Sequence, residues 1–191
     1  MTVCEIIDTG GPGSGGGGGS DGGEGGGGGD GGGGGGDIIK PWDRVLRKMI
    51  WDILMGNNDC AKWLDNGKTG SAAELMRVVP IKLVHENQDP PLLNPPDATT
   101  DKTTQGSIDV DRWGRFYADS GNGLLVGDLY SAGSFGARAV ILLHELAHKI
   151  DPKGFQDDVD PGQLGMPNTS KSEANSKLVV DKCKDAIDGK K

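Results

Sequence analysis

The stretch that decides the fold covers residues 137–148 and reads ARAVILLHELAH. A serine suited to the N-cap precedes this apolar run and an Asp-Pro pair follows it, so the pattern predicts a helix from Phe135 to about Ile150. Side chains four residues apart lie on the same face of a helix, one turn from each other. We therefore expect the imidazoles of His144 and His148 to lie side by side.

Two histidine nitrogens presented in this way can share one tetrahedral zinc ion. Glu145 lies off the ligand line but near the metal, where it can accept a proton from metal-activated water and pass it to a leaving amine. The reaction implied is hydrolysis of an amide, most often a peptide bond. The chain has only three histidines, and the motif should arise by chance in about one in a thousand such chains. The simpler alternative is a pair of surface histidines on an ordinary helix.

Residues 137–148 resemble the active-site helix of the zincin metallopeptidases. They are similar, more narrowly, to poorly characterised bacterial domains that share an LLHELAH-type core, an acidic loop and a later Ser-x-x-Asn helix with a cysteine. Here those later parts are residues 157–161, residues 172–175 and Cys183. The resemblance covers residues 107–187. It implies a zinc cofactor and an α+β, zincin-like fold, with a small mixed β-sheet packed on the HExxH helix and further helices flanking it.

The resemblance also implies a third protein ligand downstream of the helix. No histidine follows His148, so this ligand has to be acidic, and Asp151 follows the helix too closely to swing back easily. Asp157 and Asp158 lie nine and ten residues after His148, as in the aspartate-ligand zincins. Glu173 lies 25 residues on, as in zincins with a glutamate ligand, although a first-turn glutamate also suits a helix N-terminus. We expect Asp157 first, then Asp158, then Glu173.

Three other residues have simpler explanations than a role in catalysis. His85 would be an unusual ligand upstream of the helix, and a solvated or hydrogen-bonded histidine is the better interpretation. Tyr117 and Tyr130 could stabilise an oxyanion, but neither belongs to a motif, and core packing is the better interpretation.

Composition divides the chain of 191 residues into two parts. Of the 35 glycines, 21 lie in residues 10–36, where no side chain can bury much apolar surface. We therefore expect residues 1–37 to form a disordered, glycine-rich tract or linker. Residues 38–191 have the length of one domain, which is the predicted metallopeptidase domain.

The second part shows patterns of several further helices and strands. Ser71 and Glu74 have the spacing of a capping box, and Ser172 is placed to cap a last helix. The predicted helices cover residues 41–54, 60–64, 71–77 and 173 to the end. The predicted strands cover residues 78–84 (at a sheet edge), 107–117 and 123–130. A long surface loop is predicted over residues 86–106.

Charge and apolar pattern limit the partners. The net charge is −8 and no stretch is strongly basic apart from the terminal lysines, so nucleic-acid binding is not expected. Neither a secretory signal nor an apolar run long enough to span a bilayer is visible, although secretion stays open if the N-terminus is incomplete.

Three cysteines do not suggest a disulfide scaffold, and Cys60 and Cys183 are either bridged or two buried free thiols. Oligomeric state is not indicated.

Two functions remain to be compared. The first is a zinc metallopeptidase with His144, His148 and one carboxylate as ligands and Glu145 as general base. Its substrate would be a protein, a peptide or a peptidoglycan cross-link. The alternative is a non-catalytic zincin-fold binding module that the glycine-rich segment tethers. A third explanation for the abrupt change near Asp37 is a fragment or a mispredicted reading frame at the N-terminus.

Overall fold

The computed structural model describes residues 41–68, 70–84, 97–101, 103, 106–111, 114–118, 123–158 and 169–190. They belong to one compact unit that spans Ile39–Lys191. The predicted disordered tract over residues 1–37 lies outside the described residues, as do Cys4 and His85.

Three helices open the unit: α1 (Pro41–Leu54), α2 (Asp59–Asp65) and α3 (Ser71–Val78). Helix α1 begins at its proline, as predicted, because a proline at the first position gives up only an N–H that would have no helical partner. Its buried positions are Leu46, Ile50, Ile53 and Leu54, which recur at helical spacing and face the core.

The start of α3 differs from the prediction. Ser71 is already helical, the N-cap is Gly70, and no side chain of the cap residue bonds the helix. The buried carboxylate of Asp65, at the end of α2, instead accepts hydrogen bonds from Gly70 N (2.6 Å) and Ala72 N (3.0 Å). Glu74 pairs with Arg77 on the surface rather than reaching back to the cap. The cap therefore comes from the preceding helix, which a local spacing rule does not detect.

Replacing Asp65 by Ala should destabilise the protein by about 2 kcal/mol, because two amide groups at the start of α3 lose their acceptor. Chemical denaturation measures the effect. Asp52→Ala is the matched control, since Asp52 makes a surface ion pair with Lys48 and should cost less than about 0.5 kcal/mol. Equal losses in the two variants would contradict the capping role.

A mixed three-stranded sheet follows, formed by β1 (Ile81–Val84), β2 (Ala98–Thr100) and β3 (Ile108–Asp111). The strand order is β1-β3-β2, with β1 parallel and β2 antiparallel to β3. The predicted edge position of β1 is confirmed, but the strand begins at Ile81 because α3 continues to Val78. Strand β2 falls inside the predicted surface loop over residues 86–106, which is wrong at this point.

The strand predicted over residues 123–130 is a short hairpin of β4 (Leu125–Val126) and β5 (Tyr130–Ser131). Tyr130 is buried, which supports core packing rather than a catalytic role, and its hydroxyl donates to Asp188 at 3.1 Å. A Cβ atom on Gly136 would come within 2.2 Å of the Tyr130 ring. Glycine is therefore required where this ring packs on the first turn of the next helix.

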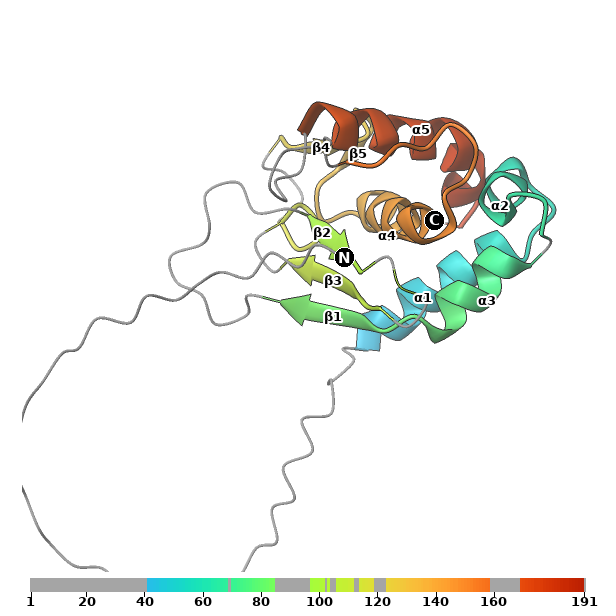
Figure 1. Cartoon of the computed structure of the whole chain (residues 1–191). Helices are drawn as coiled ribbons and strands as arrows, with labels where there is room; N and C mark the ends of the chain where they lie inside the picture. The colour runs from blue at the N-terminus through green and yellow to red at the C-terminus, as the bar shows by residue number, and fades with distance from the viewer. Residues whose placement is uncertain are drawn as a thin grey trace, which may run out of the picture. The chain divides into compact units, whose positions relative to one another are not determined.

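The central helix is α4 (Phe135–Ile150), with the predicted N-cap at Ser134 and a left-handed C-cap at Asp151. Eleven of its 16 residues are buried, which explains why its sequence is apolar almost all round. Helix α4 packs against α5 (Thr169–Asp188) on one side and against β2 and β3 on the other (Figure 1). The fold is thus α+β, as predicted: a small mixed sheet packs on the histidine-bearing helix, and further helices flank it.

Helix α5 begins at Thr169, so Ser172 lies within the helix and the predicted cap at this serine is wrong. A disulfide between Cys60 and Cys183 joins α2 to α5, and both cysteines are fully buried. This settles the choice between bridged and free thiols. Disulfides persist in oxidising compartments, and this bridge therefore hints at an extracellular or otherwise oxidising location.

Candidate metal centre

Three ligand atoms from α4 and the segment after it meet at one point. His144 Nε2 and His148 Nε2 lie 3.1 Å apart, and Asp158 Oδ2 lies 3.0 Å from the first and 3.3 Å from the second. The three side chains form a group that could hold a metal ion. The one-turn spacing on α4 thus brings the two imidazoles together, as the sequence predicts.

The size of this triangle suits zinc. Zinc–ligand bonds of about 2.0–2.1 Å in tetrahedral geometry place the ligand atoms about 3.3–3.4 Å from one another. The three observed separations, 3.0, 3.1 and 3.3 Å, come within about 0.4 Å of that value. Two imidazoles and one carboxylate are also ligands that zinc commonly takes from proteins. The residues present therefore fit a zinc ion.

The acidic member of the group is Asp158. Asp157, the first choice from the sequence, is exposed and does not belong to the group, and Glu173 is exposed on α5. Among the described residues, the possible metal group thus holds Asp158, the second choice from the sequence. In this irregular segment the carboxylate of Asp158 faces the histidines, while the side chain of Asp157 is exposed.

Helix α5 contacts two of the three candidate ligands through adjacent side chains. Asn175 Nδ2 donates to Asp158 Oδ1 at 2.6 Å. Ser176 Oγ lies 3.1 Å from His144 Nδ1. With the proton on Nδ1, His144 donates to the serine and keeps the lone pair of Nε2 for a metal. Such outer partners orient ligands and are typical of metal sites in proteins.

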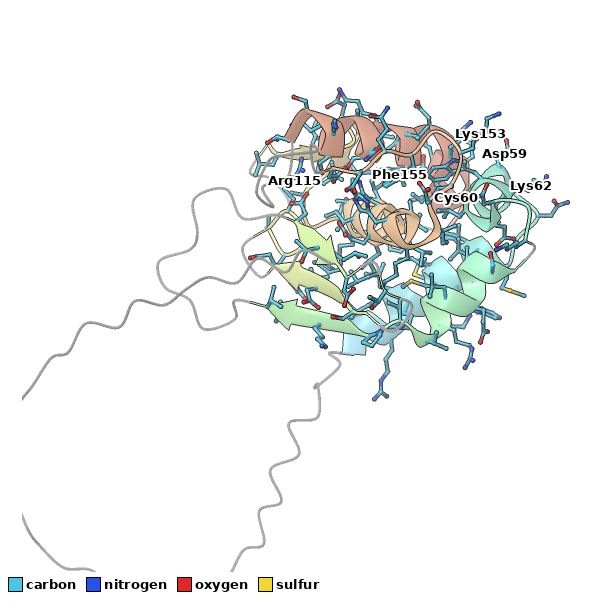
Figure 2. All side chains as sticks on the ribbon, viewed as in Figure 1. Asp59, Cys60, Lys62, Arg115, Lys153 and Phe155 are labelled. Atoms are coloured by element: carbon cyan, nitrogen blue, oxygen red, sulfur yellow. A yellow bond between two sulfur atoms is a disulfide. The ribbon has the colours of Figure 1, made fainter. Side chains whose placement is uncertain are left out.

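An aromatic side chain closes the centre on one side. The Phe155 ring meets both imidazoles edge to face, with centroids 5.3 Å from His144 and 4.9 Å from His148, and it also packs on Trp63 of α2. It lies on the α5 side of α4 (Figure 2). The indole of Trp63 donates to the Lys153 carbonyl at 3.0 Å. Phe155 thus gives the imidazoles a fixed apolar wall.

Charge holds Asp158 in the ionised form that a metal ligand needs. Burial acts to raise the pKa of Asp158, but hydrogen bonds and charge from His144 and His148 outweigh it and hold this pKa well below its usual range. Burial acts to lower the pKa of His144, yet the hydrogen bond with Asp158 and the charge of Glu145 raise it overall. The site therefore attracts positive charge, which either protons or a metal cation can supply.

Glu145 lies in the same buried region. Burial raises the pKa of its carboxyl group, although the two histidines and a hydrogen bond from Thr100 act in the opposite direction. The Thr100 hydroxyl also lies 3.4 Å from the Glu145 carbonyl. Thr100 belongs to β2, so the sheet edge nearest α4 contacts the candidate base directly.

Several contacts of the site carried no recognisable signal in the sequence. Ser176, Phe155 and Thr100 reach it from three different segments, and none belongs to a motif. Asn175 is the exception, since it lies in the Ser-x-x-Asn pattern that the resemblance singled out. The contact between Asn175 and Asp158 gives that pattern a physical reason.

Comparisons with protein-family models, curated proteins and solved structures find no match for this chain. Among the described residues, none of the helices combines the length and apolar character needed to cross a membrane.

Proposed function

We propose that this protein is a zinc-dependent metallopeptidase with a zincin-like active site. The observation that carries the proposal is the meeting of two imidazoles and one carboxylate beside a buried glutamate of the same helix. The group has three donors, the number that proteins supply in catalytic zinc sites, whereas structural sites use four. Peptides or proteins are the proposed substrates.

A zinc ion held by His144, His148 and Asp158 would supply Lewis-acid chemistry, polarising a scissile carbonyl and lowering the pKa of water. Glu145 would accept the proton of the attacking water on its carboxylate and return it to the leaving amine. The raised pKa of Glu145 brings the group closer to neutral pH, where a general base has to work in both directions. Phe155 would limit the access of bulk water to the imidazoles.

One observation favours a second candidate, a non-catalytic zincin-fold module that binds metal. The side chains of His144, His148 and Asp158 are only 5, 9 and 13% exposed, which suits a closed structural site. A structural site, however, gives no reason to bury a carboxylate beside the ligands at the cost of its desolvation. Catalysis is therefore the preferred proposal.

Metal content tests the site itself. The wild-type protein should bind one zinc ion per chain, measured by elemental analysis after dialysis, while His148→Ala and Asp158→Ala should bind at least about 100-fold more weakly. The matched controls are Asp157→Ala, which removes the same side-chain type outside the group, and His85→Ala, at a histidine that the sequence favours as solvated; both variants should retain zinc. Zinc-free wild-type protein, or zinc retained by both site variants, would refute the metal centre.

A further inference from the structure

The third ligand is carried by irregular backbone, unlike the two histidines. His144 and His148 project from a buried helix, whereas Asp158 lies in the segment 151–158 that follows α4. A carboxylate on a loop loses conformational entropy when it is fixed in one position. A well-formed site therefore needs contacts that hold this carboxylate in place before the metal binds.

The side chain of Asn175 holds this segment at two points. Its carboxamide pairs with the peptide groups of Gln156: Nδ2 donates to the Gln156 carbonyl at 2.7 Å, and Oδ1 accepts from Gln156 N at 3.2 Å. The same Nδ2 donates to Asp158 Oδ1 at 2.6 Å. The Asn175 amide thus fixes both the backbone at Gln156 and the Oδ1 atom of Asp158. The other carboxylate oxygen, Oδ2, is left facing the two imidazoles.

The helix behind Asn175 is itself firmly anchored. Asn175 is only 3% exposed, and Val179 and Cys183, which follow at four-residue intervals on α5, lie in the core. The disulfide from Cys183 to Cys60 ties this helix to α2. Trp63 of α2 donates to the Lys153 carbonyl of the same segment, and the C-cap residue Asn66 donates to the Asp151 carbonyl. The ligand-bearing segment is thus bonded by helices on two sides.

We propose that Asn175 is a positioning residue that presets Asp158 for metal binding. This inference rests on the proposed metal site, and it adds a residue that acts through a ligand without touching the metal. An amide is required because the position needs two donors and one acceptor at once. Alanine lacks all three bonds, and aspartate keeps the shape and the acceptor but places a second negative charge against Asp158.

The experiment measures the zinc affinity of the full-length wild type, Asn175→Ala and Asn175→Asp by competition with a chromophoric chelator. We expect each variant to bind zinc about 10–100-fold more weakly, the usual effect of losing an outer partner of a ligand. Cobalt-substituted samples should also show a changed visible spectrum, because Asp158 no longer takes a fixed position. Ser170→Ala, on the exposed start of α5, is the control and should match the wild type in both readouts.

The thermal stability of the metal-free proteins separates positioning from a general loss of structure. Asn175→Asp keeps the packing of the side chain, so it provides the readout if Asn175→Ala does not fold. Wild-type affinity together with an unchanged cobalt spectrum in Asn175→Asp would overturn the inference. If the wild type itself binds no zinc, the proposed metal site is refuted. If the wild type binds zinc but has no peptidase activity, catalysis is refuted and the role of Asn175 stays intact.

Discussion

Replacing Glu145 by Gln should lower peptidase turnover by about 10²–10⁴-fold and leave zinc content unchanged, because general-base catalysis typically contributes this factor. The amide has nearly the shape of the carboxylate but cannot accept and return a proton at neutral pH. Glu145 is not in the group of candidate ligands, so its loss should not release the metal. Steady-state hydrolysis of a peptide library, with zinc measured on the same samples, tests both statements.

The control for this substitution is Glu173→Gln, which makes the same chemical change at an exposed position of α5. It should keep wild-type turnover and zinc content. Glutamine at 145 also relieves the cost of burying a charge, so this variant should be at least as stable as the wild type. Equal turnover in Glu145→Gln and the wild type would rule out the proposed base and favour the non-catalytic module.

Removing the disulfide should have the largest effect on stability. The double variant Cys60→Ala/Cys183→Ala should lose about 4–5 kcal/mol of unfolding free energy, because the bridge closes a segment with a sequence separation of 123 and restricts the unfolded chain accordingly. Both cysteines are fully buried, so the small cavities left by alanine add to the loss. Guanidinium denaturation under non-reducing conditions measures the change.

Cys4→Ala is the matched control, because Cys4 is not part of the bridge and belongs to the tract that the sequence predicts to be disordered, so the denaturation midpoint should stay unchanged. Wild type treated with a reductant after partial unfolding should approach the stability of the double variant. A double variant as stable as the wild type would show that the bridge does not contribute to the unfolding free energy.

The central helix and its histidine pair could be predicted because their signals are local. The cap at Ser134, the apolar run and the Asp-Pro end fix α4 from adjacent residues, and helical spacing alone places His144 beside His148. The same reasoning gave the first residue of α1, where proline is favoured for a reason that involves no distant contact.

The features that were missed or misplaced depend on distant contacts. Asp158, rather than Asp157, meets the histidines, and its hydrogen-bond partner Asn175 is 17 residues away in sequence, on α5. The start of α3 is capped by Asp65 from the previous helix. Strand β2 exists because β3 offers it a pairing edge, and its three residues lie in a stretch whose composition predicts a loop.

The bridge between α2 and α5 has a consequence for cleavage of the chain. All three candidate ligands, Glu145 and Asn175 lie between its two half-cystines in sequence. A single cut by a protease anywhere between residues 60 and 183 would leave both pieces covalently joined. Such a clipped molecule would migrate as one species without reductant and as two with it, and the fragments would stay together at any dilution.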